Sequence, residues 1–230
     1  MKSELLQALN EARADKRRVC LVRYLDDGSE ALIIDGKLRI GDLAPDLAEA
    51  VANAARRDQS TAVDSGRGRA FIQIFNPPLR LIVIGAVHIA QALVPLATMA
   101  GYHVTVVDPR RAFATDSRFP DVVVSRDWPD EAMEALRPDR RTTVVALTHD
   151  PKIDDPGLDV ALRSEAFYIA ALGSRRTHAG RLERLGALGH DTATLARIHG
   201  PAGLDIGAVS PAEIAVSIMA EMTRALRVPA

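Results

Sequence analysis

The sequence has a single cysteine, no long hydrophobic run and no excess of charge of either sign. Cys20 is the only cysteine among the 230 residues. A disulfide within the chain is therefore excluded, as are zinc and iron–sulfur sites built from several cysteines. Because Cys20 stands in the middle of a strand-like run, we interpret it as a small core residue rather than a metal ligand.

The shortage of apolar runs bears on the location of the protein. The most apolar stretch, Leu79 to Ala86, is far too short to cross a bilayer. The segment from Met1 to Arg18 is polar and amphipathic and lacks the apolar core of a signal peptide. We therefore expect a cytoplasmic protein that does not enter the membrane.

The charges nearly cancel. The chain has 29 Lys and Arg residues against 30 Asp and Glu residues, which gives a formal net charge of −1. Non-specific binding to nucleic acid needs an excess of cations that neutralise phosphate groups. We therefore expect no nucleic-acid partner.

Residues 1–76 have the pattern of a small α+β domain. Helical spacing runs from Ser3 to Lys16 and from Asp46 to Arg56, and Asp-Gly turns separate short strand-like runs. The predicted strands are Val19–Leu25, Ala31–Ile34, Lys37–Ile40, Thr61–Val63 and Ala70–Phe75. The domain ends at Asn76-Pro77-Pro78, because consecutive prolines interrupt both helices and sheet ladders.

Residues 77–230 alternate between apolar strands and helices. The predicted strands are Leu81–Ile84, His103–Val107, Val122–Val124, Thr143–Thr148 and Phe167–Leu172. The predicted helices between them are Ile89–Met99, Asp130–Leu136, Leu158–Glu165, opened by Asp155-Pro156, and Thr177–Leu185. A last helix begins with the capping sequence Ser210-Pro211-Ala212-Glu213. This alternation predicts an α/β fold with a Rossmann-like, doubly wound parallel sheet.

The first turn of this domain resembles a dinucleotide fingerprint. Gly85 to Ala90 follows the first strand, and Asp108 ends the second strand at the spacing of a ribose-binding carboxylate. The middle glycine of the fingerprint is replaced by Val87, whose branched side chain hinders approach of a pyrophosphate to the backbone. The motif alone leaves binding of a dinucleotide and a purely structural turn equally open.

Two further polar segments follow strands of the predicted sheet. His149-Asp150 can transfer protons or bind a polar ligand, or can simply cap the next turn. Gly173 to Thr177 brings a hydroxyl group and two arginines to the start of a helix, which suits a phosphate or another oxyanion. Solvated arginines on a surface turn are the alternative.

A glycine-rich loop from His199 to Ala208 precedes the last helix. Its glycines indicate unusual backbone angles or close approach to a ligand, and an ordinary long connection is the alternative.

In this order, these motifs are similar to the XdhC/CoxI family of accessory proteins for xanthine dehydrogenase and carbon monoxide dehydrogenase. The similarity covers about two thirds of the chain, from Pro77 to the end. The matching segments are Gly85–Ala90, Val104–Arg110, Phe113-Ala114, Arg118–Pro120, Thr148–Lys152 with Asp154, Gly173–Thr177, Gly203–Ala208 and Pro211–Ala215.

The resemblance implies a chaperone that binds molybdenum cofactor, a phosphorylated pterin, and assists its maturation or insertion into a xanthine dehydrogenase-type molybdenum hydroxylase. It implies the hydroxylase and a sulfur-transfer enzyme as partners, and the architecture allows a homodimer. We expect neither catalytic turnover nor a metal site of the chain itself. The expected cofactor-binding residues are Gly85, His88, Asp108, Arg110, His149, Asp150, Gly173, Ser174, Arg175, Arg176, Asp205 and Gly207.

The chain departs from the family pattern in two places. Val87 replaces a glycine in the first turn, and the N-terminal part lacks the Gly-Ser-x-Pro and Gly-Gly-Cys-x-Glu segments of the family. Ile40-Gly41-Asp42 is the nearest trace of the second segment, so no thiolate is available at that position as a ligand of molybdenum. The chain therefore resembles a divergent member.

Two other functions stay open. One is a NAD-dependent oxidoreductase on the same fold, for which Asp108 would favour NAD over NADP and against which Val87 counts. The other is an interaction protein that docks a dehydrogenase or a sulfur-transfer enzyme without binding the cofactor.

Overall fold

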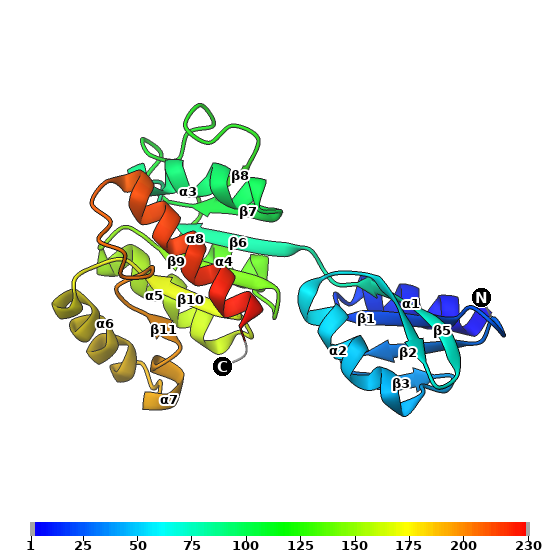
Figure 1. Ribbon diagram of the computed structural model, residues 1–230. Coiled ribbons are helices and arrows are strands. Elements are labelled where there is room, and N and C mark those ends of the chain that lie inside the picture. The colour runs from blue at the N-terminus through cyan, green and yellow to red at the C-terminus, as the bar shows by residue number, and fades with distance from the viewer. Residues whose placement is uncertain (1–2, 229–230) are drawn as a thin grey trace. The chain divides into compact units, whose positions relative to one another are not determined.

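The computed structural model describes residues 3–228, and its contacts divide the chain into two compact units, residues 1–77 and 78–230. The first unit holds α1 (Ser3–Ala14), β1 (Val19–Tyr24), β2 (Glu30–Ile34), β3 (Lys37–Ile40), a 3-10 turn η1 (Pro45–Leu47), α2 (Ala48–Arg57), β4 (Thr61–Ser65) and β5 (Gly68–Phe75). Figure 1 shows the elements of each unit.

The N-terminal unit is an antiparallel sheet with one helix on each face. Its strand order is β3-β2-β1-β5-β4, and all neighbouring strands are antiparallel. Residues of β1 alternate between the faces: Val19 and Leu21 pack with α1, whereas Cys20 and Val22 pack with α2. The predicted N-terminal α+β fold is confirmed.

The C-terminal unit contains β6 (Leu79–Ile84), α3 (His88–Met99), β7 (Tyr102–Val107), β8 (Val123–Ser125), α4 (Pro129–Leu136), β9 (Thr142–Ala146), α5 (Pro151–Arg163), β10 (Tyr168–Ala171), α6 (Arg175–Ala187), α7 (Thr192–Leu195), β11 (Ile198–His199) and α8 (Pro211–Arg227). The strands form one parallel sheet in the order β11-β10-β9-β6-β7-β8. From β6 the chain winds outward to β8 in one direction and from β9 to β11 in the other, which confirms the doubly wound Rossmann-like sheet.

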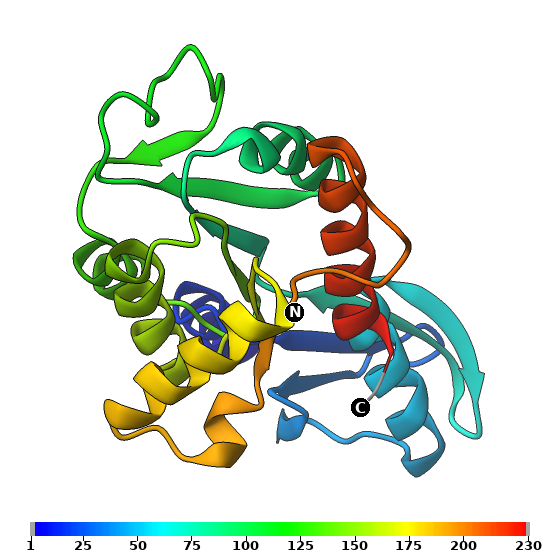
Figure 2. The ribbon, with the colours of Figure 1, turned by 90° about the vertical axis from the view of Figure 1, so that its left-hand side faces the viewer.

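Helices cover both faces of this sheet. Alternate strand residues such as Leu81 and Val83 pack with α3 and α8, while Ile82 and Ile84 pack with the layer of α4, α5 and α6. In Figures 1 and 2, α3 and α8 lie side by side. The strands are buried from both sides, which explains their continuous apolar sequences.

The start of α5 corrects one prediction. The helix begins at Pro151 and not near Leu158, so Asp155-Pro156 lies inside it rather than before it. The side chain of Asp150 caps the helix by accepting a hydrogen bond from the N–H of Lys152, and proline at the first helical position leaves no donor unpaired. Strand β9 accordingly ends at Ala146 and not at Thr148, and the short α7 and β11 were not predicted.

The predicted capping of the last helix is confirmed. The Ser210 hydroxyl accepts a hydrogen bond from the Glu213 N–H, and the Glu213 carboxylate accepts one from the Ser210 N–H.

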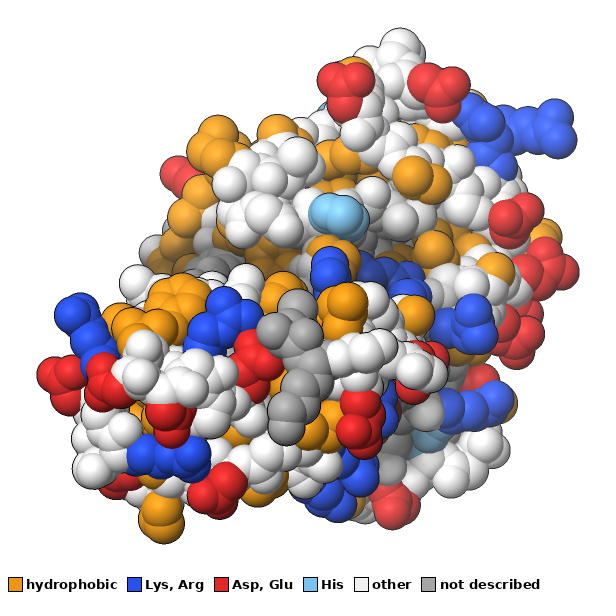
Figure 3. Space-filling view, turned by 90° about the vertical axis from the view of Figure 1, so that its right-hand side faces the viewer, with side chains coloured by type: hydrophobic (Ala, Val, Ile, Leu, Met, Phe, Trp, Pro, Cys, Tyr) orange, Lys and Arg blue, Asp and Glu red, His pale blue; other side chains and the backbone are white. Residues whose placement is uncertain are grey.

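Within residues 3–228, no helix is long and apolar enough to cross a membrane. On the face drawn in Figure 3, acidic and basic side chains are interspersed.

The packing of α5 on the sheet predicts opposite effects for two glycine substitutions. A Cβ added at Gly157 would lie 2.5 Å from Cδ1 of the buried Ile84 and 3.1 Å from Cβ of Pro129, whereas one at Gly186 in α6 would meet only Leu195 at 3.6 Å. Gly157→Ala should lower the free energy of unfolding by about 1–3 kcal/mol through overpacking. Gly186→Ala should raise it by about 0.5–1 kcal/mol. Urea unfolding of both variants measures this, and a Gly157→Ala protein at least as stable as wild type would contradict the packing.

Candidate functional site

Four strands of the C-terminal unit end in line. Ile84 pairs with Val107 on one side and with Ala146 on the other, and Ala146 pairs with Ala171. The alignment continues one residue further, because the N–H of Gly85 donates to Val107 O and the N–H of Leu147 donates to Ile84 O. The loops that begin at Gly85, Asp108, Thr148 and Gly173 therefore leave the sheet at one edge.

The turn after β6, which begins at Gly85, lies against the loop after β9. The strand order reverses between β6 and β9, so this is the switch point where ligands of such sheets bind. Gly85 has a φ of +106°, and an added Cβ would overlap with Cγ2 of Thr148. Glycine is required here by backbone angle and by the neighbouring loop. Val87 follows as the N-terminal boundary of α3 and makes no side-chain cap, which leaves the first N–H groups of the helix for other acceptors.

Asp108 fixes this turn from the end of β7. The side chain is fully buried. Its Oδ2 accepts hydrogen bonds from the N–H of Ala86 and from Nη2 of Arg110, both at 2.8 Å, and its Oδ1 accepts bonds from the N–H and Nε of Arg110, both at 2.9 Å. These bonds use the acceptor positions of the carboxylate. Asp108 therefore positions the turn and has no position left for ribose hydroxyl groups.

The electrostatics of Asp108 agree with this role. Burial acts to raise the pKa of the carboxyl group, but the hydrogen bonds from Arg110 and Ala86 outweigh burial and lower the pKa below its ordinary value. Arg110 also lies over the ring of Phe113, with 4.4 Å from Cζ to the ring centroid. Arg118 donates to Ala86 O at 2.8 Å and so ties the loop after β7 to the same turn.

The loop after β9 carries His149 at an exposed position with a φ of +64°. The N–H of His149 donates to Oδ2 of Asp154 at 3.0 Å, and the Thr148 hydroxyl donates to Oδ1 of Asp154 at 2.6 Å. Burial raises the pKa of Asp154, although hydrogen bonds from Thr148 and the charge of Arg181 act in the opposite direction. Asp150 serves as the cap of α5, so capping, one of the two roles open to it, is present.

The loop after β10 meets the loop after β9. An added Cβ at Gly173, whose φ is +141°, would lie 3.5 Å from Nδ1 of His149. Ser174 caps α6 by accepting a hydrogen bond from the Thr177 N–H at 3.1 Å. Arg175 and Arg176 begin α6 and are exposed. Two cations thus stand at the start of a helix, as the sequence predicts.

The glycine-rich loop, residues 199–208, is held mainly by α8 rather than by the other loops. Buried Glu221 accepts hydrogen bonds from the Tyr168 hydroxyl at 2.7 Å, from the N–H of Gly203 at 2.9 Å and from Nδ1 of His199 at 3.1 Å. An added Cβ at Gly203 would overlap with the Ser217 hydroxyl, so this glycine permits close packing against α8. Asp205 and Gly207 are exposed, and within residues 3–228 no hydrogen bond or ion pair joins them to the other four loops.

A cavity of about 240 Å³ lies between α5 and α6. Its lining residues are His149, Pro151, Asp154, Asp155, Arg176, Thr177, Gly180, Arg181 and Arg184. The prediction included His149 and Arg176 but missed Arg181 and Arg184. Thr177, Arg181 and Arg184 recur at helical spacing, which was the available signal that they share one face of α6.

Arg181 is a cation whose side chain is only 2% exposed. Its Nη2 donates to Leu172 O at 3.0 Å and lies 3.7 Å from Oδ2 of Asp154, whereas Nε and Nη1 have no hydrogen-bond partner among residues 3–228. Burial lowers the pKa of the guanidinium, and Asp154 only partly compensates. Arg184, in contrast, forms two hydrogen bonds to the Asp155 carboxylate, at 2.5 and 3.2 Å.

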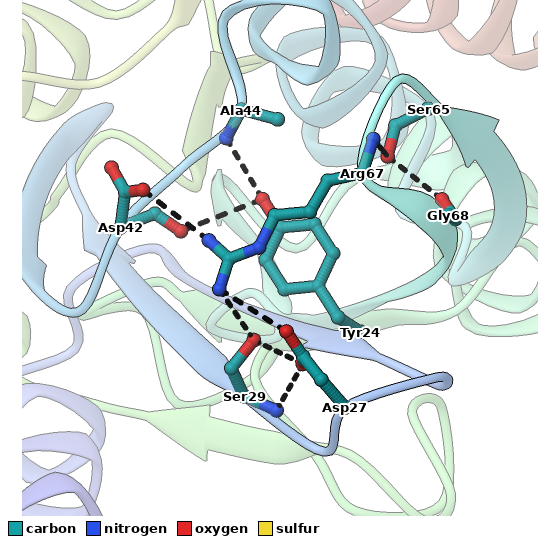
Figure 4. A network of polar contacts seen from close by, with 8 residues as sticks. All are labelled: Tyr24, Asp27, Ser29, Asp42, Ala44, Ser65, Arg67 and Gly68. Carbon is teal, nitrogen blue, oxygen red and sulfur yellow. Dashed lines mark hydrogen bonds and ion pairs between the residues drawn. The ribbon is translucent and has the colours of Figure 1, made fainter.

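The N-terminal unit has a separate cavity of about 480 Å³, next to Gly41-Asp42. Figure 4 shows how Arg67 organises its wall: the guanidinium lies 4.5 Å from the ring centroid of Tyr24 and pairs with Asp27 and Asp42, each at 3.3 Å. The two carboxylates neutralise the cation, so this cavity has no evident preference for an anion.

Burial raises the pKa of Cys20 to about 11, so its thiol is protonated at neutral pH.

Comparison with known proteins places the C-terminal unit. Residues 81–222 match the family model of the XdhC Rossmann domain. The chain is 31% identical over 173 residues to uncharacterized protein YqeB of Escherichia coli K12, covering 72% of this chain and 31% of that protein. It is 34% identical over 154 residues to a probable xanthine dehydrogenase subunit of Bacillus subtilis 168, covering 66% of this chain and 44% of that protein. The chain therefore belongs to the XdhC family.

Two more similarities extend this result. The molybdenum cofactor insertion chaperone PaoD of Escherichia coli K12 is 32% identical over 148 residues, covering 64% of this chain and 40% of PaoD. A crystal structure of a xanthine dehydrogenase from Bacillus halodurans superposes with a TM-score of 0.70 at 26% identity, covering 97% of this chain and 67% of that one. The chain spans less than half the length of these three curated relatives.

From the ion pair between buried Asp108 and Arg110, we expect the stability of the fold to depend on pH. Because the folded-state pKa of Asp108 lies below that of the unfolded state, about 3.9, the ionised group stabilises the fold above that pH. This stabilisation is lost as the pH falls through the folded-state pKa. Asp108→Asn should lower the free energy of unfolding by about 2–3 kcal/mol at pH 7, and the difference should shrink at pH 3. Urea unfolding at both values measures this, and a difference that does not change with pH would contradict the assignment.

Proposed function

We propose that this member of the XdhC family is an accessory protein that binds molybdenum cofactor as cargo and assists its maturation or insertion into a xanthine dehydrogenase-type molybdenum hydroxylase. The observation that carries the proposal is the convergence of the loops at Gly85, Thr148 and Gly173 on the switch point of the sheet. Family membership, and the name of the relative PaoD, support the choice of cargo.

The residues at this edge suit a phosphorylated pterin. The uncapped start of α3 offers N–H groups to an anion, and Arg175 and Arg176 supply positive charge at the start of α6. His88, the first residue of α3, and His149, in the loop after β9, are exposed and provide polar contacts for the ring system of the cargo. Within residues 3–228, no group of three or more His, Cys, Asp or Glu could hold a metal ion, so we propose that the chain holds molybdenum through the pterin.

The same geometry disfavours a dinucleotide. The carboxylate that would bind a ribose is Asp108, and its acceptor positions are filled by Arg110 and Ala86. Val87 occupies the place of the glycine next to the pyrophosphate. The client enzyme, a sulfur-transfer partner and a second copy of the chain are parts of the proposal that rest on the family alone.

Cofactor retention tests the proposal. Chain co-expressed with a molybdopterin pathway should yield a fluorescent pterin after purification and oxidation. Arg175→Ala combined with Arg176→Ala should reduce the pterin content severalfold, because two cations near the anionic cargo are lost. The matched control is Arg140→Ala combined with Arg163→Ala, which also removes two exposed arginines.

Two outcomes would count against this function. Purified chain without pterin, where PaoD treated in the same way retains it, would contradict cofactor binding. Loss of hydroxylase binding in the double variant with unchanged pterin content would instead favour the interaction protein.

Calorimetry with NAD and NADH tests the alternative. We expect no heat of binding at millimolar dinucleotide, because Asp108 is not free to accept from a ribose. Saturable binding of NAD in this range would refute this reading of Asp108 and revive the oxidoreductase.

A further inference from the structure

The charges around the cavity between α5 and α6 do not balance. Its wall contains the guanidinium groups of Arg176, Arg181 and Arg184 against the carboxylates of Asp154 and Asp155. Arg184 and Asp155 satisfy each other with two hydrogen bonds. Asp154 is occupied by Thr148 and His149 and lies 3.7 Å from Arg181. One positive charge in this wall is left over.

Arg181 is the residue at which this imbalance is most costly. A buried charge is stable only when ion pairs and hydrogen bonds replace the water it has lost. Arg181 has one hydrogen bond, to Leu172 O, and two nitrogen atoms without a partner among the described residues. Because the group is shielded from solvent, its positive potential in the adjoining cavity is weakly screened.

Arg176 provides a second cation at the same cavity. It is exposed at the start of α6, and no ion pair within residues 3–228 involves its guanidinium. Thr177 adds a hydroxyl group to the wall. An arginine that is buried and underpaired, next to one that is exposed and free, forms an arrangement that suits an oxyanion rather than a cation.

The size of the cavity limits the ligand. At about 240 Å³ it is smaller than the roughly 300 Å³ at which pockets for drug-sized ligands begin. This volume is large enough for a phosphate or another small charged group of a ligand. A phosphate group fits both the volume and the guanidinium geometry.

We propose that the cavity between α5 and α6 is a phosphate-binding site in which Arg181 and Arg176 contact the phosphate oxygens. A phosphate there supplies acceptors for the unpaired nitrogen atoms of Arg181 and neutralises the excess charge. The site itself does not depend on the proposed function. The identification of its ligand as the phosphate monoester of the cofactor does rest on that function.

Titration of the cofactor-free chain with inorganic phosphate tests the site. Calorimetry should show saturable binding in the millimolar range or tighter. Arg176→Ala should weaken binding about tenfold, the usual effect of losing a charged hydrogen-bond donor. Arg181→Met, which keeps the volume of the side chain and removes its charge, should abolish binding. Arg163→Ala makes the same change of net charge outside the cavity and should leave binding within twofold of wild type.

The result that overturns the site is absence of phosphate binding to wild type, or equal weakening by Arg176→Ala and Arg163→Ala. Because Arg181 is buried, thermal unfolding of Arg181→Met accompanies the titration, and the surface variant Arg176→Ala decides the question if that protein is unfolded. Competition distinguishes the source of the phosphate. If inorganic phosphate displaces pterin from the loaded chain, and Arg176→Ala lowers pterin content, the cofactor uses this site. If pterin content is unchanged while phosphate binding is lost, the site binds a free phosphate or another phosphorylated ligand.

Discussion

The parallel register of the four central strands is the constraint on which the rest of the C-terminal unit depends. Because Val107, Ile84, Ala146 and Ala171 are paired across β7, β6, β9 and β10, the segments that follow them emerge together. The strands are buried on both faces, and a register shift would move their apolar side chains out of the two helical layers. The packing of the core therefore fixes the strand register, and the register brings the loops of the candidate site together.

Two buried ions at this edge have different surroundings. Asp108 accepts four hydrogen bonds and is fully satisfied by Arg110 and Ala86. Arg181 has one hydrogen bond and a distant carboxylate. A satisfied ion stabilises the loop geometry, whereas an underpaired one favours a ligand of opposite charge. The contrast separates the structural part of the edge from the part that is available to cargo.

The fold could be predicted from the sequence because its signals are local. Apolar runs such as Leu81–Ile84 predicted buried strands, and Ser210 with Glu213 predicted the start of the last helix. The prediction failed at α5, where Asp155-Pro156 resembled a helix start and the earlier cap at Asp150 decided the boundary. Both Asp150-Pro151 and Asp155-Pro156 have the sequence of a helix start. Only the structure shows that the helix begins at the first of them.

The site was harder to predict because its key features are non-local. That Asp108 fixes the turn after β6 depends on its hydrogen bond from Ala86, 22 residues away. The underpaired state of Arg181 depends on Asp154 being engaged by Thr148 and His149. The sequence indicated the strand-end loops and Arg176, but burial and pairing, which separate a structural charge from a binding charge, required the structure.

The most direct test of the account is a crystal structure of the chain carrying molybdenum cofactor. We expect the pterin between the loops at Gly85, His149 and Gly173, with its phosphate in hydrogen-bond contact with Arg176 and Arg181. Well-ordered cofactor in the cavity beside Arg67 of the N-terminal unit, with the edge of the parallel sheet empty, would contradict it.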